Sequence, residues 1–259
     1  MANRLTGRVA IVTGAARGVG FADASLLSSE GAQVILTDVN EALGVEAAEK
    51  IGNGAKFFRH DVSSEADWKS LIAMVDEQFG GLNVLVNNAA ILQAADIVNE
   101  TLEGWQRIQR VNSDSVFLGM KHAIPLMERT GGGSIINMSS SAAISGQSMF
   151  PAYSASKAAI CGLTRSVAVY CHQKKNNIRC NTIHPDGIMT PMMMEIGQKM
   201  AEDGLVAVDP VKAEQAASYT CAPEDVAAVV LFLASDDSKR ISGIQLPVDS
   251  SSTITAPYQ

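Results

Sequence analysis

The sequence predicts an α/β protein built on one doubly wound parallel sheet that is flanked by helices on both faces. Three observations predict this fold class. Short apolar runs alternate along the chain with longer segments of helical pattern. Most of these runs are continuously apolar, as expected for strands that are buried on both faces. A glycine-rich turn, TGAARGVG, joins the first run to the first helical segment, which is the arrangement of a Rossmann-type dinucleotide-binding fold.

Strand and helix signals follow one another along the whole chain. The expected strands cover residues 9–12, 33–37, 56–59, 84–86, 134–138, 178–183 and 244–248. The expected helices lie near residues 17–30, 40–51, 64–79, 101–129, 152–176 and 224–235, where Pro223 is a helix-entry signal for the last. A strand–helix–strand order implies parallel strands with right-handed crossovers. Because the sequence has neither a linker nor an internal repeat, we expect a single domain over residues 1–259.

The segment from about 190 to 221 interrupts this alternation. It lies between a strand and the last helix, and loops inserted at the carboxyl edge of a parallel sheet cover the ligand. We therefore expect a substrate lid here. Methionines could give the lid a soft apolar wall, or could simply pack it against the core. They are Met189, Met192, Met193, Met194 and Met200.

Charge and hydropathy argue against several kinds of partner. The net charge of −7 disfavours nucleic acid, whose phosphates are neutralised by Lys and Arg. No apolar run approaches the length of a membrane span, and the first residues lack the shape of a signal peptide. We therefore expect a cytoplasmic protein with a small-molecule substrate and neither a membrane nor a nucleic-acid partner.

The cysteines and histidines suggest neither disulfides nor a metal site. None of Cys161, Cys171, Cys180 and Cys221 forms a C-x-x-C pair, so we expect them to be reduced and structural. We do not expect Cys161 or Cys171 to act as a thiolate nucleophile. The four histidines show no metal-ligand spacing, and we predict no metal.

The turn after the first strand is a candidate cofactor site. Gly14, Gly18 and Gly20 permit a sharp turn and a close approach of the backbone to a pyrophosphate, with Arg17 and Val19 between them. The following helix offers free N–H groups and the positive end of its dipole. The turn lacks the GK[ST] of a triphosphate-binding loop. The sequence thus predicts a dinucleotide.

Asp38, at the end of the second strand, bears on which dinucleotide binds. A carboxylate there accepts hydrogen bonds from both hydroxyls of the adenosine ribose and repels a 2′-phosphate, which favours NAD over NADP. Arg17 could neutralise such a phosphate, but we expect direct repulsion by Asp38 to outweigh a more distant cation. Asp38 could also cap the helix near 40–51, although Asn40 is an equally good cap.

Polar residues also follow the third and fourth strands. Asp61 and Val62 lie at the carboxyl edge of the sheet, where Asp61 could contact adenine or cap the next helix, two readings that spacing alone does not separate. Asn87 and Asn88 end the fourth strand. Because buried amides need partners, we expect them to bond a neighbouring strand, the cofactor ribose, or both.

A candidate catalytic group lies further along the chain. Tyr153 and Lys157 are spaced i, i+4 on a predicted helix and so share one face, while Ser140 ends the fifth strand. A phenol titrates near pH 10, so it needs a stabilised anion to exchange protons at neutral pH. Lys157 could supply that stabilisation, and a drop of about 3 units corresponds to roughly 4 kcal/mol. Tyr153 would then act as general acid or base in hydride transfer, with Ser140 holding the substrate oxygen.

Asn112 is a polar residue in an otherwise apolar helical stretch, RVNSDSVFLG. It could hold a water molecule that relays protons to Lys157. From the residues alone, a core asparagine with satisfied hydrogen bonds is the preferred interpretation.

These motifs together resemble the short-chain dehydrogenase/reductase family over essentially the whole chain. TGAARGVG, Asp61-Val62, NNAA, YSASK and NTIHPDGIMT occur in the family's order and spacing. The resemblance implies a catalytic group of Asn112, Ser140, Tyr153 and Lys157.

The resemblance also implies further contacts with the cofactor. Lys157 would bind the nicotinamide ribose, Ile188 and Thr190 the carboxamide, and Asn88 the ribose side. A homotetramer or homodimer built through the helices near 101–129 and 152–176 is implied as well. Three motifs depart from the family pattern: NNAA replaces NNAG, Asp186 replaces a glycine, and VDSS replaces VDGG. None of these changes removes a catalytic group.

Within the family, HDVSSEADW, LNVLVNNA, SIINM and IHPDGIMTPMM resemble bacterial 3β/17β-hydroxysteroid dehydrogenases. This implies a secondary alcohol on a bulky apolar ring system. The alternatives are an NADPH-dependent 3-oxoacyl-carrier-protein or general carbonyl reductase, which Asp38 does not favour, and a non-catalytic dinucleotide-binding protein, which the intact catalytic set does not favour.

Overall fold

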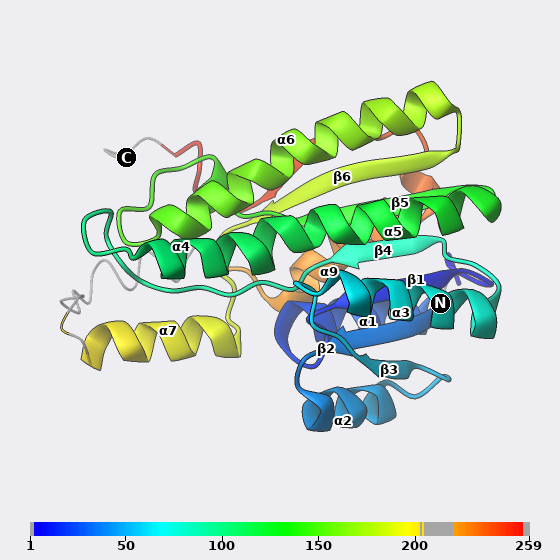
Figure 1. Cartoon of the computed structure of the whole chain (residues 1–259), viewed down its shortest axis with the longest axis horizontal. Helices are drawn as coiled ribbons and strands as arrows, with labels where there is room; N and C mark the ends of the chain where they lie inside the picture. Colours follow the sequence, from blue (N-terminus) through cyan, green and yellow to red (C-terminus); the bar gives the residue numbers. More distant parts are fainter. Residues whose placement is uncertain (1–2, 203, 205–219, 256–259) are drawn as a thin grey trace.

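The protein folds around one sheet of seven parallel strands (Figure 1). The computed structural model describes residues 3–202, 204 and 220–255. The strands are β1(Val9–Thr13), β2(Gln33–Asp38), β3(Lys56–Arg59), β4(Val84–Asn87), β5(Gly133–Met138), β6(Ile178–Pro185) and β7(Gln245–Val248). Their order is β3-β2-β1-β4-β5-β6-β7. The direction of winding reverses between β1 and β4, which is where ligands bind in doubly wound sheets.

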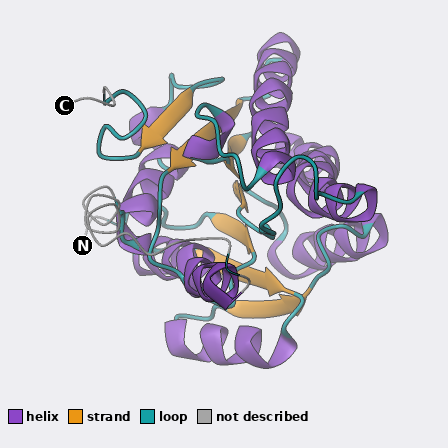
Figure 2. Cartoon of the chain, turned by 90° about the vertical axis from the view of Figure 1, so that its left-hand side faces the viewer, coloured by secondary structure: helices purple, strands orange, loops and turns teal. Residues whose placement is uncertain are grey.

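Helices cover both faces of the sheet (Figure 2). One face carries α1(Gly18–Ser29), α2(Glu41–Ile51) and α9(Pro223–Ala234), and the other carries α3(Glu65–Phe79), α5(Ser115–Arg129) and α6(Pro151–Lys174). The helices α4(Leu102–Gln109) and α7(Pro191–Glu202) lie at the carboxyl end of the strands (Figure 1). The predicted fold class is therefore confirmed.

Two hydrophobic cores explain why the strands read as continuous apolar runs. Ala10 and Val12 of β1 belong to one core, whereas Ile11 between them belongs to the other. All three side chains are fully buried. Alternate side chains of a strand point to opposite faces, so a strand with helices on both sides needs apolar residues at every position.

The helix expected over residues 101–129 is interrupted. A π-helical turn, Arg110–Asp114, separates α4 from α5. Asn112 lies in this turn, where its Oδ1 accepts from the N–H of Ile91 at 2.8 Å and its Nδ2 donates to the carbonyl of Ile91 at 2.9 Å. The amide thus pairs with the loop after β4, and π-helical turns often mark functional sites.

Only part of the expected lid is described. Residues 190–202 form the end of a loop and α7, while 203 and 205–219 lie outside the described residues. Among the helices of the described part, none is long and apolar enough to cross a membrane.

Candidate active site

The carboxyl ends of the central strands bring the predicted site residues together. The glycine-rich turn follows β1, Asp38 ends β2, and Asn88 follows β4. Ser140 follows β5, and Tyr153 lies near the start of α6. In Figure 1 the beginning of α6, α4 and α7 all lie at this end of the sheet.

The turn after β1 has a shape that requires glycine. Gly14 has a φ of +63°, and a Cβ there would lie 2.8 Å from the Cα of Ala89. A Cβ on Gly20 would lie 2.4 Å from the carbonyl oxygen of Gly14. Asn88 braces the turn from β4, because its Nδ2 donates to the carbonyl oxygens of Thr13 at 2.9 Å and Gly14 at 3.2 Å.

The N-terminus of α1 is suited to bind an anion. The N-cap residue, Arg17, makes no side-chain hydrogen bond to the first turn of the helix, and that turn contains no acidic residue. The N–H groups and the positive end of the helix dipole therefore face the turn without a side-chain acceptor. With backbone packed closely around Gly14 and Gly20, this cradle fits a dinucleotide pyrophosphate.

Asp38 bonds both the glycine-rich turn and the residue that precedes α2. Its Oδ2 accepts from the N–H of Ala16 at 3.2 Å, and its Oδ1 accepts from the N–H of Asn40 at 3.0 Å. Asn40 caps α2, since its side chain accepts from the N–H of Leu43 at 3.1 Å. The capping role left open by the sequence thus belongs to Asn40, and Asp38 holds a carboxylate beside the glycines.

Asp61 closes a turn ahead of α3. Its Oδ1 accepts from the N–H of Ser63 at 2.9 Å and from the Ser63 hydroxyl at 2.7 Å. Ser64 caps α3 by accepting from the N–H of Asp67. Asp61 therefore shapes the loop before the helix without being its cap, and contact of Asp61 and Val62 with adenine stays a prediction.

The two asparagines after β4 have different partners. Asn87 Nδ2 donates to Asn137 Oδ1 of the neighbouring strand β5 at 2.8 Å. Asn88 donates its two hydrogen bonds to the glycine-rich turn, at the carbonyl oxygens of Thr13 and Gly14. Of the possibilities open from sequence, the structure shows Asn87 on the neighbouring strand and Asn88 against the turn.

Ser140, Tyr153 and Lys157 form a compact group. Lys157 is 2% exposed, and its Nζ donates to the carbonyl oxygen of Met138 at 2.8 Å. The same Nζ lies 5.5 Å from the centroid of the Tyr153 ring. The Tyr153 hydroxyl lies beside the side chain of Ser140, which lowers the pKa of the phenol. A phenol is thus held between a hydroxyl and a buried amine.

Burial acts on both titratable groups of this set. It raises the pKa of Tyr153, against the smaller lowering by the side chain of Ser140. It lowers the pKa of Lys157 to about 7. Both changes disfavour the charged forms. Tyr153 therefore favours its neutral phenol form here, and formation of the phenolate needs a further interaction that offsets burial.

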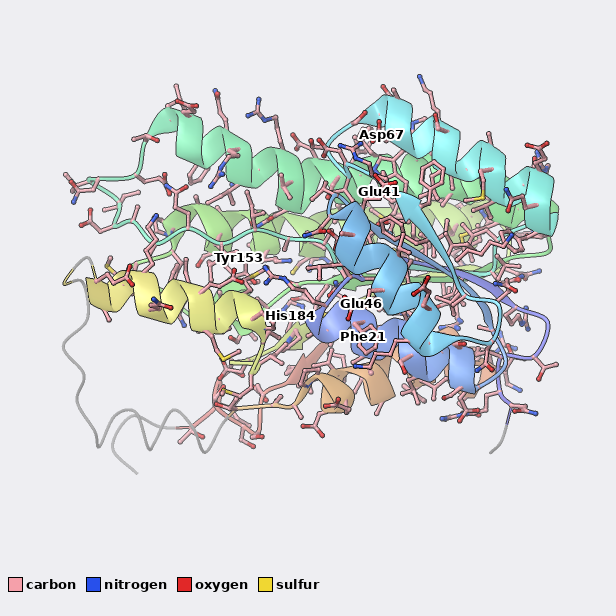
Figure 3. The ribbon with its side chains drawn as sticks, turned by 90° about the horizontal axis from the view of Figure 1, so that it is seen from below. Phe21, Glu41, Glu46, Asp67, Tyr153 and His184 are labelled. Carbon is pink, nitrogen blue, oxygen red and sulfur yellow. The ribbon has the colours of Figure 1, made fainter. Side chains whose placement is uncertain are left out.

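His184 joins this group from β6, and sequence reasoning missed it. Its Nδ1 lies 3.0 Å from the carbonyl oxygen of Ser140 and so carries the donated proton. Its Nε2 faces the hydroxyl of Thr182 at 3.1 Å and the thiol of Cys161 at 3.7 Å. Figure 3 shows Tyr153 and His184 at the end of the sheet beside α7. The signal for His184 in the sequence was a polar residue within a strand that was predicted to be buried.

This geometry also places a histidine beside one of the cysteines. Cys161 has a histidine neighbour in space, although none adjoins it in sequence, because β6 runs beside α6. Burial lowers the pKa of His184, with the charge of Lys157 acting in the same direction. A neutral His184 that donates from Nδ1 holds the backbone of Ser140 in place.

The start of α7 lies over the glycine-rich turn. A Cβ on Gly18 would lie 3.6 Å from Cγ2 of Thr190, within ordinary contact. Arg17 binds Glu195 of α7. Ile188, two residues before Thr190, pairs in parallel with Cys221. Thr190 therefore lies next to the cofactor cradle, and contact of Ile188 and Thr190 with the carboxamide stays a prediction.

The fold and the cradle define a dinucleotide-binding oxidoreductase, and comparison with known proteins identifies its family. The model of a family described as "Enoyl-(Acyl carrier protein) reductase" matches residues 14–252. The chain belongs to the short-chain dehydrogenase/reductase family. It is an oxidoreductase that uses a nicotinamide dinucleotide.

Three relatives illustrate the range of chemistry. The chain is 47% identical to a 3-beta-hydroxysteroid dehydrogenase of Comamonas testosteroni, covering 97% of this chain and 98% of that protein. It is 38% identical to 2,5-dichloro-2,5-cyclohexadiene-1,4-diol dehydrogenase LinX of Sphingobium indicum, covering 96% and 97%. It is 36% identical to the NADP-dependent (R)-specific alcohol dehydrogenase of Lentilactobacillus kefiri, covering 98% and 99%. The resemblance to bacterial hydroxysteroid dehydrogenases is confirmed.

Proposed function

We propose that this protein is an NAD-dependent dehydrogenase of secondary alcohols, acting on a hydroxysteroid or another bulky apolar cyclic alcohol. The observation that carries the proposal is the grouping of Ser140, Tyr153 and Lys157 beside the dinucleotide cradle. A hydroxyl that binds the substrate oxygen, a phenol that exchanges its proton and an amine that tunes the phenol are the parts that alcohol oxidation needs.

The cradle around Gly14 and Gly18 would hold the dinucleotide, whose nicotinamide would supply the hydride acceptor for alcohol oxidation or the hydride donor for the reverse reaction. Ser140 and Tyr153 hydrogen-bond the substrate oxygen and orient the carbon. Tyr153 accepts the hydroxyl proton of the alcohol as the carbonyl forms, and donates it back in the reverse direction. In this proposal the protonated form of Lys157 opposes the effect of burial on Tyr153 and favours its phenolate form during the reaction. His184 positions Ser140 through its backbone carbonyl.

Asn112 has a supporting role in this proposal. Its side-chain amide bonds the backbone of Ile91 and donates to the hydroxyl of Ser156 at 3.2 Å. These bonds fill most of the capacity of the amide. We therefore assign the side chain to holding the loop after β4 against α6, next to Tyr153 and Lys157, rather than to holding a water molecule.

The preference for NAD rests on Asp38 and Arg17. Asp38 places a carboxylate beside the turn, where it suits ribose hydroxyls and repels a 2′-phosphate. Arg17 is the nearby cation that could offset this repulsion, but its charge is engaged by Glu195. In this proposal an Asp38→Asn variant loses about tenfold or more in kcat/KM with NAD⁺ and gains with NADP⁺, as measured by initial rates with each cofactor.

The relatives and the loop composition support a bulky apolar substrate. Two relatives are named for a hydroxysteroid and a chlorinated cyclohexadiene diol. Met192 and Met200 line a cavity beside the site, and methionine adapts to irregular apolar surfaces. The alternative is an NADPH-dependent 3-oxoacyl-carrier-protein or carbonyl reductase, which the relative from Lentilactobacillus kefiri keeps open through its NADP dependence.

The test is an NADH-absorbance assay with NAD⁺ and, separately, NADP⁺. The substrate panel contains 3β- and 17β-hydroxysteroids, cyclohexanol, aliphatic secondary alcohols and sugar alcohols. We expect fast reduction of NAD⁺ with a hydroxysteroid. Activity with NADP⁺ alone would overturn the cofactor proposal, and turnover of small or polar alcohols without any steroid would overturn the substrate proposal.

We also propose that the protein self-associates through α5 and α6 as a homodimer or homotetramer. Phe117 on α5 and Val169 and Tyr170 on α6 are apolar side chains exposed by 48%, 56% and 45%. Burial of such surface stabilises an interface. Light scattering coupled to gel filtration measures the assembly, and a Val169→Glu, Tyr170→Glu variant should dissociate it. A monomeric wild-type protein would contradict this proposal.

A further inference from the structure

A cavity of about 210 Å³ lies between α7, α4 and the loop after β4. Its apolar walls are Leu92, Ala94, Met192, Ile196 and Met200. The loop that supplies two of these residues continues directly from Ile91, which Asn112 holds, and its Ala95 donates to the carbonyl of Met149 at 3.0 Å. The cavity therefore adjoins the segment that leads into the catalytic helix α6.

Two cations also line this cavity. Arg107 of α4 and Lys199 of α7 form no ion pair with any carboxylate in the described part of the chain. Arg107 Nη2 donates to Gln93 Oε1 at 3.0 Å, a neutral acceptor that orients the guanidinium without cancelling its charge. The one acidic residue of the lining, Glu195, is already bound to Arg17.

The cavity is thus apolar along its walls and carries an unbalanced positive charge. We propose that it binds a carboxylate at the far end of the substrate, so that the enzyme acts on a bulky alicyclic alcohol that also carries an acid group. This inference rests on the proposed function and names the substrate class of that site. A guanidinium and an ammonium give a carboxylate short charge-assisted hydrogen bonds, and a planar guanidinium can bind both its oxygens.

The length of α7 separates Lys199 from the cofactor cradle. The helix begins at Thr190–Pro191, over the glycine-rich turn, and Lys199 lies nine residues beyond Thr190. At 1.5 Å per residue this is roughly 13 Å along the helix. A fused-ring alcohol with a short acidic side chain spans a distance of this order, whereas a small hydroxy acid does not.

The test compares a 3β-hydroxysteroid that carries a side-chain carboxylate with its methyl ester. The two probes differ in charge and hardly in shape. In the wild-type protein we expect kcat/KM to be about tenfold higher for the acid than for the ester, mainly through KM. The preference should shrink at about 0.5 M salt, which screens the exposed charges of Arg107 and Lys199. Equal values for acid and ester would overturn the proposal.

Variants assign the preference to the two cations. Lys199→Met and Arg107→Gln should each lower the acid-to-ester ratio severalfold, and Lys199→Glu should bring it below one. Lys239→Met is the matched control, because Lys239 is an exposed lysine outside the cavity, and it should leave the ratio unchanged. If none of the substitutions of Lys199 and Arg107 changed the acid-to-ester ratio, the assignment to these cations would be overturned even if the wild-type protein preferred the acid.

Failure of the proposed function has a separate signature. If acid, ester and uncharged 3β-hydroxysteroid are all inert, the reaction proposal fails rather than the carboxylate site. Calorimetry with a steroid acid that lacks the hydroxyl group, in the presence of NADH, then tests the site alone. Binding that is weakened by Lys199→Glu supports the site, and absence of binding overturns it.

Discussion

The guanidinium of Arg17 forms a two-point ion pair with the carboxylate of Glu195, with Nη1–Oε1 at 2.5 Å and Nη2–Oε2 at 3.2 Å. Arg17 precedes the first helix of the cofactor cradle, and Glu195 lies on α7. The pair raises the pKa of Arg17 and lowers that of Glu195. The position of α7 and the charge beside the cofactor cradle are therefore linked.

This link predicts that Glu195→Gln changes the choice of cofactor. Loss of the carboxylate releases Arg17, which can then neutralise a 2′-phosphate. Because the pair is exposed, we expect a modest rise, about two- to fivefold, in the ratio of kcat/KM for NADP⁺ to that for NAD⁺. Glu202→Gln on the same helix is the control, since Glu202 bonds Gln198 instead. An unchanged ratio would show that Arg17 has no influence on the 2′ position.

A second prediction concerns the pH dependence of stability. Burial lowers the pKa of Lys157 to about 7, whereas a lysine in the unfolded chain titrates near 10.4. Between about pH 7 and pH 10 the unfolded chain therefore binds a proton that the folded protein has lost. The free energy of unfolding should rise with pH across this window, by at most about 1.4 kcal/mol per pH unit from this group.

Urea denaturation of the wild-type protein and of Lys157→Met at pH 7 and pH 9 measures this contribution. The difference between the two proteins isolates Lys157 from other groups, such as the buried Cys180 thiol, whose pKa burial raises. The free energy of unfolding of the wild-type protein should increase relative to that of the variant as the pH rises. Parallel pH dependences would mean that Lys157 keeps an ordinary pKa in the folded protein.

A third prediction concerns the serines that replace the family's terminal glycines. Ser250 and Ser251 have φ values of +48° and +71°, a region that costs an L-residue about 1–2 kcal/mol. Glycine relieves this strain but costs more entropy on folding. We expect Ser250→Gly and Ser251→Gly each to stabilise the protein by about 0.5–1 kcal/mol in thermal or urea denaturation.

Ser252→Gly is the matched control for these substitutions. Ser252 is not among the described non-glycine residues with positive φ, so a glycine there brings the entropic cost without relief of strain. We expect it to lower stability by about 0.5–1 kcal/mol. Destabilisation by all three substitutions would argue against strain at this turn.

The architecture could be predicted from the sequence because strands that are buried on both faces of a sheet are apolar at every position. The run around Ile11 shows no alternation of apolar and polar residues. The glycine-rich turn with Gly14 falls between the first strand, β1, and the first helix, α1. The π-helical turn was not predictable, because it depends on Asn112 meeting the backbone of Ile91, a contact between two elements. Local pattern does not contain that information.

The site was predicted unevenly for the same reason. Tyr153 and Lys157 share a helix face, so their spacing is informative. His184 acts on Ser140 across two strands, and Arg17 meets Glu195 across 178 residues. Both contacts arise from the fold. Asp38 illustrates the intermediate case, in which position suggested two roles and the hydrogen bond from Ala16 favours the one beside the turn.

The most direct measurement of the central claim is turnover and NADH binding by Tyr153→Phe. The substitution removes one hydroxyl from the group formed with Ser140 and Lys157. We predict that kcat with the preferred hydroxysteroid falls by about 10³-fold or more, because the acid–base group is lost. The dissociation constant for NADH, followed by its fluorescence, should stay within about twofold. Turnover close to that of the wild-type protein would contradict the role of Tyr153 and the mechanism built on it.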